Sequence, residues 1–552
     1  MRRIRGEAVI ETGVWPVPAA VYPKHGLGEN LRPMRFPRLH VAAALSCLVA
    51  TPPLPASAAQ SAGPPLRPPA PREAPPAVAR EFRAAWVATV GNIDWPSRPG
   101  LSTWDQQQEL LAILNRAVAL RLNAIILQVR PGTDALYDSR LEPWSEYLTG
   151  RMGRPPEPAW DPLGFAVTEA HRRGLELHAW VNPYRARYAR PISQTARTHI
   201  SRTHPELVRA YGPYLWMDPG VPAVRRRAER VVLDIVRRYD VDGVHVDDYF
   251  YPYKEKDSAG AVIPFPDSTS YARYRRGGGT LERDDWRRHN VDLLIHELYL
   301  GIKGIKPWVQ FGISPISGWR ENTPAGARTF DAYGEIYADT RKWLALGWCD
   351  YFVPQLYSLI ESPTPYPLML RWWVEQNAKG RHLYAGNGLY RVRRTDPADS
   401  NGTRAPAWPA DEILRQVEIT RGMPGAQGNV FFSMKALMQD ADSIDERLAV
   451  PYAAPALVPA SPWLHLNPPP RPAIALRHDG ATGEPYLTLR PADGRKPWLW
   501  VVQTRSDSGW SAELLPGYQR VHRLAGGREP DLVYVSAVDR TGNQGPPAAI
   551  RP

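Results

Sequence analysis

The sequence predicts an α/β protein: a (β/α)8 TIM barrel over residues 81–440, followed by a small β-sandwich over residues 471–552. Three observations support this prediction. Apolar strand-like runs alternate with amphipathic helical runs from residue 82 to residue 434. The segments after the strands are long and aromatic, whereas the segments before them are short. Short β runs separated by turn signals follow a Pro/Ala-rich boundary at 441–470.

The barrel strands are expected where β-branched and aromatic residues form short apolar runs. In chain order they cover 82–89, 124–130, 175–183, 242–249, 308–315, 351–357, 382–389 and 428–434. The intervening helices are expected at 104–120, 162–173, 222–239, 284–303, 337–346, 367–378 and 410–421. Strands that alternate with helices in this way favour a closed parallel barrel.

The loops differ between the two ends of this barrel. Long aromatic segments follow the strands, at 90–103, 131–161, 184–221, 250–283 and 316–336. Long loops on one rim are typical of an active-site face, because barrel enzymes place their chemistry at the carboxyl ends of the strands.

The C-terminal part contains short β runs at 473–476, 486–489, 498–504 and 532–538. Such runs with turns between them predict a β-sandwich. Its tryptophans Trp498, Trp500 and Trp510 offer a glycan-binding surface as one interpretation. Packing or a spacer role is the favoured alternative.

The N-terminus predicts export. Residues 34–59 have a basic start, a short apolar core and a small-residue cleavage site, as in a signal peptide. Residues 1–33 are interpreted as an upstream mis-start, and the Pro/Ala-rich residues 60–80 as a linker. The expected location is the periplasm. In the alternative, acylation of Cys47 would tether the chain to the membrane as an outer-membrane lipoprotein.

Composition excludes several classes of protein. The chain carries 68 Lys+Arg and 56 Asp+Glu, a formal net charge of +12, without a Lys/Arg block. An anionic wall polymer suits this charge, whereas no nucleic-acid motif accompanies it. There are only two cysteines, and neither a CxxC nor an HExxH motif occurs. No nucleic-acid partner, metal or organic cofactor is therefore expected.

The stretch 242–252 is the strongest indication of chemistry, because Asp247 and Asp248 stand at the end of a predicted buried strand. Carboxylates at this position can cleave a glycosidic bond, and the aromatics beside them suit a sugar ring. If Asp247 points into the barrel mouth, strand alternation directs His245 and Tyr249 there too. Asp248 then faces the other way or lies in the loop. The structural alternative is that these aspartates cap the next helix or pair with arginines.

Other polar and aromatic groups collect at strand ends. Alternation places Gln128 with Arg130, Gln355 with Tyr357, and His178 with Trp180 and Asn182. For each residue alone, a satisfied buried hydrogen bond is an equally good explanation. Their shared position at one rim favours substrate binding.

Glycoside hydrolysis normally needs a second carboxyl group. Asp248 and Glu321 are the main candidates, because the loop after the fifth strand can reach across to Asp247. Asp339, Asp134 and Asp94 are further candidates, and Asp339 is better explained as a helix cap.

The barrel resembles the glycosyl-hydrolase-like family ten, which includes divisome-associated peptidoglycan glycosyl hydrolases of bacteria. The most specific match is Val-Asp-Gly-Val-His-Val-Asp-Asp-Tyr-Phe-Tyr-Pro at 241–252. Weaker matches occur in order at 83–89, 94–96, 128–131, 143–144, 178–185, 286–290, 311–315, 337–343 and 354–357. The C-terminal part resembles a fibronectin-type-III-like module, with 534–543 as its closing strand and turn.

The resemblance implies hydrolysis of peptidoglycan glycan strands stripped of their peptides, with cell-division proteins as candidate partners. It carries Asp247 and Asp248 over as functional residues. We therefore expect Asp247 to act as nucleophile or stabilising carboxylate, and Asp248 or Glu321 as the acid/base. The residues expected to orient or stack on the sugar are Gln128, Arg130, His178, Trp180, Asn182, Tyr184, Arg185, His245, Tyr249, Gln355 and Tyr357.

Two alternatives remain open from the sequence. The first is a non-catalytic glycan-binding or division-site scaffold, which the weak second carboxylate motivates. The second is a hydrolase of a different polysaccharide.

Overall fold

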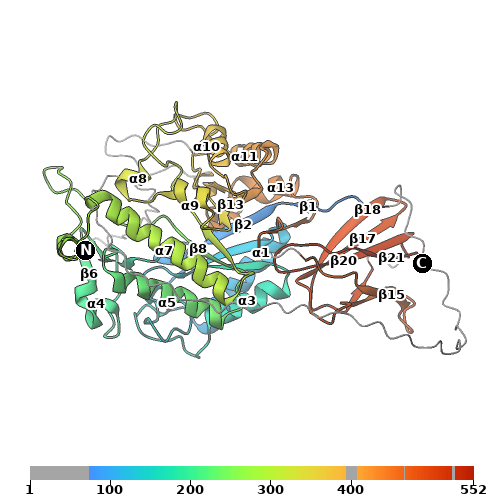
Figure 1. The fold of residues 1–552 in the computed structure, drawn as a ribbon. Coiled ribbons are helices and arrows are strands. Elements are labelled where there is room, and N and C mark those ends of the chain that lie inside the picture. Colours follow the sequence, from blue (N-terminus) through green and yellow to red (C-terminus); the bar gives the residue numbers. More distant parts are fainter. Residues whose placement is uncertain (1–73, 393–406, 465–466, 525–528, 552) are drawn as a thin grey trace, which may run out of the picture.

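The computed structural model describes residues 74–392, 407–464, 467–524 and 529–551. A barrel wrapped by helices occupies most of the molecule, and a smaller all-β unit lies at one end (Figure 1). The predicted leader segments 1–33 and 34–59, Cys47 and residues 60–73 lie outside the described residues. Within the described ranges, no helix combines the length and the apolar character needed to cross a bilayer.

The barrel is built from parallel strands in the hydrogen-bonded order β11-β10-β9-β8-β4-β3-β2-β13-β12. They are β2 (Phe82–Val87), β3 (Ala124–Arg130), β4 (Glu176–Val181), β8 (Gly243–Val246), β9 (Gln310–Ile313), β10 (Tyr351–Phe352), β11 (His382–Leu383), β12 (Ala385–Asn387) and β13 (Gly428–Phe431). β11 and β12 are two halves of the seventh strand, separated only by Tyr384. The Tyr384 N–H donates to Phe352 O at 2.9 Å, so the ladder continues. The sheet therefore closes on itself, and the predicted TIM barrel is confirmed.

Helices cover the outside of the barrel (Figure 1). The helices that follow the predicted helical runs are α1 (Thr103–Ala119), α3 (Pro162–Arg172), α5 (Pro222–Arg238), α7 (Arg283–Ile305), α9 (Thr340–Leu346), α10 (Tyr366–Glu375) and α11 (Ala410–Gly422). The additional helices are α2 (Glu146–Thr149), α4 (Ile200–Thr203), α6 (Ser268–Arg276), α8 (Ala332–Glu335), α12 (Met434–Met438) and α13 (Ile444–Ala449). The helix expected from residue 337 begins later, because Tyr337 has a positive φ of 57° that an α-helix does not accept.

Several strands end sooner than the apolar runs suggest. β8 stops at Val246 instead of residue 249, and β10 stops at Phe352 instead of residue 357. Pro354, which has no N–H to donate, follows β10 closely. The residues just after these strands are therefore in irregular backbone, where strand alternation no longer sets the direction of a side chain.

The C-terminal unit consists of two antiparallel sheets, as predicted. One is β15 (Ala473–His478), β16 (Pro485–Arg490) and β19 (Val521–Arg523). The other is β18 (Gly509–Pro516), β17 (Leu499–Ser506), β20 (Leu532–Val538) and β21 (Ala548–Ile550). Trp500 is fully buried between them and donates to Gln519 O at 3.0 Å, so it packs the core. The sequence did not predict β18, β19 and β21, because these strands either mix polar with apolar residues or are very short.

This unit is attached to the strand starts of the barrel. Arg540 reaches Asp240 at 2.9 Å and Asp242 at 2.8 Å, just before β8. Trp498 packs edge-on against His171, with ring centroids 4.8 Å apart. The sequence predicts a linker at 441–470, but its described part contains α13 and β14 (Ala456–Leu457), and β14 pairs in parallel with β1 (Ala79–Arg80).

The opposite end of the barrel carries the long loops. Three short strands, β5 (Arg185–Arg187), β6 (Val208–Tyr211) and β7 (Tyr214–Met217), form a small sheet within the loop after β4. Figure 1 shows β6, α4 and α8 at this end, away from the β-sandwich. The sandwich therefore leaves the carboxyl ends of the barrel strands uncovered.

Candidate active site

Two adjacent carboxyl groups lie at the carboxyl end of β8. Asp247 and Asp248 are both buried, and one amide nitrogen, Gln355 Nε2, donates to Oδ1 of each at 3.1 Å. Both side chains therefore face the same partner. This arrangement corresponds to the alternative in which Asp248 lies in the loop, because β8 has already ended at Val246.

Further donors fix the pair. The Asp248 N–H donates to Asp247 Oδ1 at 2.9 Å, and the Tyr253 hydroxyl donates to Asp248 Oδ2. Gln355 Nε2 also lies 3.2 Å from Ser314 O at the end of β9. Asp248 thus accepts hydrogen bonds from a phenol and an amide.

The two carboxyl groups have different electrostatic surroundings. Burial, followed by the charge and hydrogen bonding of Asp248, raises the pKa of Asp247 well above its usual range. The Arg185 cation lowers it in part. Two carboxylates so close together cannot both ionise easily. The raised pKa favours the protonated form of Asp247, which lies next to the hydrogen-bond-accepting Asp248.

The separation of the pair limits the mechanism. Because a single nitrogen lies 3.1 Å from both oxygens, these oxygens cannot be further apart than twice that distance. Inverting glycosidases hold their carboxyl groups about 6.5–9.5 Å apart, to leave room for a water molecule. The two Oδ1 atoms therefore lie closer together than this range, which is more typical of a retaining pair.

Aromatic rings surround the pair. Tyr249 is half-buried, and the Arg185 guanidinium lies over its ring, 4.5 Å from the centroid. Tyr357 is also half-buried and stacks on Phe432 with ring centroids 5.8 Å apart. Tyr184 is different, because it is fully buried in the main hydrophobic core and has no exposed ring face for a sugar.

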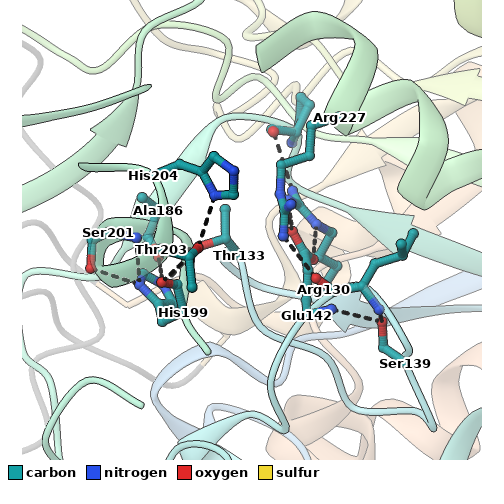
Figure 2. A network of polar contacts seen from close by, with 12 residues as sticks. Arg130, Thr133, Ser139, Glu142, Ala186, His199, Ser201, Thr203, His204 and Arg227 are labelled. Atoms are coloured by element: carbon teal, nitrogen blue, oxygen red, sulfur yellow. Dashed lines mark hydrogen bonds and ion pairs between the residues drawn. The ribbon is translucent and has the colours of Figure 1, made fainter. Parts of the chain in front are cut away.

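Arg130 is enclosed by protein. It is fully buried, and its guanidinium forms two hydrogen bonds of 2.6 Å with Glu142 (Figure 2). It also donates to Asn182 O. In the same view the Thr133 hydroxyl lies 2.7 Å from His199 Nε2. This contact connects the loop after β3 with the loop after β4. Arg130 therefore links the loops that follow β3 and β4. Each of its guanidinium nitrogens already has a partner within the protein, which leaves none for a sugar hydroxyl.

His178 and His245 lie inside the barrel, below the carboxylate pair. The Trp86 indole N–H, which can only donate, gives its hydrogen bond to His245 Nε2 at 3.1 Å. His245 Nδ1 must then carry the proton, and it contacts the Tyr351 hydroxyl at 3.1 Å. Tyr351 donates in turn to His178 Nδ1 at 2.7 Å, and His178 Nε2 donates to Glu176 at 3.1 Å.

This series of hydrogen bonds engages both ring nitrogens of His245 and both ring nitrogens of His178. Burial lowers the pKa of His245 well below its usual range, which keeps the ring neutral as the chain requires. The ring nitrogens of both histidines are therefore engaged inside the barrel, whereas the sequence analysis expected them to face the substrate.

Gln128 and Asn182 are fully buried, but within the described ranges only the oxygen of each side-chain amide has hydrogen-bond partners. Gln128 Oε1 accepts from the N–H groups of Thr89 at 3.0 Å and Val90 at 2.8 Å. Asn182 Oδ1 accepts from Trp180 Nε1 at 2.8 Å. The NH2 group of each amide has no hydrogen-bond partner among the described residues. Both remain candidate substrate donors.

Glu321 is separate from the pair. It lies exposed in the loop after β9, and its backbone oxygen accepts from Thr323 Oγ1. No described hydrogen bond or ion pair joins its side chain to Asp247 or Asp248. Of the expected catalytic carboxylates, the structure brings only the two adjacent ones together.

Sequence reasoning missed Tyr253, Ser314 and Glu142. Tyr253 belongs to the aromatic run after Asp248, so its presence nearby was visible, but the turn that brings its hydroxyl back was not. Glu142 lies in the loop after β3 and carries no pattern that pairs it with Arg130.

A cavity of about 260 Å³ lies at the other end of the barrel, between the barrel and the sandwich. It is lined by Asn123 and Glu176 at strand starts, and by Trp498 and Leu499 of the sandwich. Barrel chemistry takes place at the carboxyl ends of strands, so we place the candidate site at the aspartate pair despite this cavity.

Comparisons with known proteins point to one family. Residues 81–401 match the family model described as glycosyl hydrolase-like 10. "Glycosyl hydrolase YngK" of Bacillus subtilis is 40% identical over 489 residues, covering 84% of this chain and 92% of that protein. "Glycosyl hydrolase DigH" of Escherichia coli K12 is 34% identical over 388 residues, covering 65% of this chain and 85% of that protein.

Solved structures are more distant. The PgaB (BpsB) glycoside hydrolase domain from Bordetella bronchiseptica is 12% identical with a TM-score of 0.42, covering 67% of this chain and 98% of that domain. The catalytic domain of β-amylase from Paenibacillus polymyxa is 12% identical with a TM-score of 0.42, covering 65% and 94%. These two likenesses are too weak to inform the chemistry.

Proposed function

Because the chain belongs to the glycosyl hydrolase-like 10 family, we propose that it hydrolyses the glycosidic bonds of peptidoglycan glycan strands that have lost their peptides. The observation that carries the hydrolytic part is the aspartate pair at the end of β8, held by one amide and one phenol. The choice of polymer draws on the sequence resemblance and on the chain's basic charge.

In this proposal Asp247 is the general acid. Its proton passes to the glycosidic oxygen as the bond from that oxygen to the sugar C1 breaks. Asp248 remains a carboxylate and stabilises or attacks the positive C1, and a water molecule later supplies the hydroxyl that replaces the leaving group. These roles exchange those expected from the sequence, because burial and Asp248 keep the proton on Asp247.

The location and partners extend the same proposal. The predicted signal peptide directs the chain to the periplasm, with acylation of Cys47 as an alternative tether and cell-division proteins as candidate partners. The C-terminal sandwich is proposed to be a fibronectin-type-III-like module. Trp498 and Trp500 are used in packing, so a spacer role fits better than glycan binding.

The deciding experiment uses purified chain 60–552 and peptidoglycan glycan freed of peptides. We expect new reducing ends and shorter oligosaccharides, identified by mass spectrometry. Tight binding without cleavage would favour the scaffold alternative. Cleavage of another polysaccharide, with none of the denuded glycan, would favour the second alternative.

The anomeric outcome is a sharper prediction. Because the two Oδ1 atoms lie closer together than the range of inverting pairs, the products should first appear with the configuration of the bond that was cleaved. Proton NMR in the first minutes of the reaction, before mutarotation, measures this. Inverted products would show that a more distant carboxylate, such as Glu321, takes part.

The pH dependence also follows from the pair. Asp247 must be protonated to act as an acid, and burial raises its pKa well above the usual carboxyl range. Activity should therefore persist above about pH 5, where an ordinary carboxyl has lost its proton, and fall as pH rises through the raised pKa. Initial rates at subsaturating substrate measure this limb. A rate that rises steadily with pH would contradict the acid role.

A further inference from the structure

Arg185 is a buried cation without a carboxylate partner. It is only 3% exposed, and no carboxylate of the described residues lies within ion-pair distance of it. Its Nε donates to Pro131 O at 3.0 Å, while its Nη2 is buried and has no hydrogen-bond partner among those residues. The ring of Tyr249 supports its flat face.

Other buried arginines of this barrel are neutralised. Arg130 has two hydrogen bonds of 2.6 Å to Glu142. Arg287 binds Asp267 through contacts of 2.7 and 2.9 Å. Because an unpaired buried charge is costly, a cation left in this state normally has a counter-ion that arrives with a ligand.

The position of Arg185 connects it with the candidate active site. Its charge is close enough to lower the pKa of Asp247 in part. Tyr249, over which it lies, directly follows Asp248 in the chain. The negative charge of Asp248 is already bound by Tyr253 and Gln355.

The unpartnered groups nearby are also donors. Asn182 Nδ2 and Gln128 Nε2 are buried without hydrogen-bond partners among the described residues, at the ends of β4 and β3. β4 is the direct neighbour of β8, which leads to the aspartates. Arg185 Nη2, Asn182 Nδ2 and Gln128 Nε2 are thus, in the described part of the chain, unpartnered donors that follow or end strands β4 and β3, and such donors suit an acceptor-rich, negatively charged group.

We propose that Arg185 is the core of a carboxylate-binding subsite, which selects a sugar with a free carboxylate at or beside the bond that is cleaved. This inference rests on the proposed function and adds a substrate feature to it. In peptidoglycan glycan the matching group is the lactyl carboxylate of muramic acid. It is an amide when the peptide is attached and a free anion after the peptide is removed. Arg185 is thus a specificity residue that recognises the loss of the peptide.

The test uses two forms of one denuded glycan: the native form with lactyl carboxylates, and the same material with these groups converted to primary amides. We expect wild type to prefer the carboxylate form. In Arg185→Gln, KM for that form should rise about 10- to 100-fold, as expected for losing a charge-assisted hydrogen-bonded contact. The amide form should show little change between the two proteins.

Two further variants complete the design. Arg185→Lys keeps the charge but loses the bidentate fork, so its KM for the carboxylate form should lie between those of wild type and Arg185→Gln. Arg202→Gln removes an exposed cation from α4, at the same end of the barrel, and should behave like wild type. If Arg185→Gln does not fold, the lysine variant and the wild-type preference decide.

The outcomes separate the possible roles. Equal losses on both substrates, with a shifted alkaline limb, would show that Arg185 only tunes Asp247, and would overturn the subsite. Equal cleavage of both forms by wild type would overturn it as well, while leaving the hydrolase intact. Cleavage of neither form would instead remove the proposed function itself.

Discussion

Asp247→Asn is expected to lower kcat/KM for denuded glycan by about 10²–10⁴, the range that a positioned general acid contributes. Asparagine keeps the size of the side chain and can still meet Gln355 and the Asp248 N–H. It carries no acidic proton for the leaving oxygen. Release of reducing ends, followed over time with both proteins, measures the loss.

The controls separate acid catalysis from other roles. An aryl glycoside with a good leaving group needs no protonation, so Asp247→Asn should recover much of its relative activity on such a substrate. A nucleophile mutant would not recover in this way. Asp257→Asn changes an exposed aspartate in the same loop and should keep wild-type rates. Full activity of Asp247→Asn on glycan would remove Asp247 from the mechanism.

Arg130→Met should destabilise the folded barrel by about 3–5 kcal/mol, because the buried Glu142 carboxylate loses its two 2.6 Å hydrogen bonds and, among the described residues, keeps only Arg227, at 3.7 Å. Both side chains of this ion pair are fully buried. Urea unfolding followed by tryptophan fluorescence measures the loss in the free energy of unfolding. The KM of the protein that remains folded should change little, since Arg130 has no free group to offer a sugar.

A double variant tests whether the buried Glu142 carboxylate causes this loss of stability. Arg130→Met combined with Glu142→Leu removes both charges, so part of the lost stability should return. A single Arg130→Met with unchanged stability but a raised KM would support the substrate-binding role that the sequence suggested. It would contradict the closed ion pair of Figure 2.

Local patterns in the sequence were enough for the architecture. The runs at 124–130 and 532–538 coincide with β3 and β20, because period-two and apolar patterns report which residues one element buries. The same local signal placed Asp247 and Asp248 at the end of a barrel strand. Closed barrels keep their chemistry at that end, so the location of the candidate site could also be predicted.

Depth within the barrel could not be read from these patterns. His178 and His245 alternate correctly, yet they lie below the aspartates in a chain of hydrogen bonds that begins at Trp86, on a different strand. Whether an inward-facing residue reaches the rim or the interior depends on how neighbouring strands are staggered. That stagger is set by packing around the whole barrel.

The partners of charged groups were decided by tertiary structure as well. The sequence by itself determined the barrel, the sandwich and the position of the aspartate pair, because each depends on residues close together in the chain. Only the folded chain enclosed Arg130 with Glu142, left Arg185 without a carboxylate, and kept Glu321 exposed. Each of these results depends on the course of a long loop, and that course is fixed by contacts between residues far apart in the sequence.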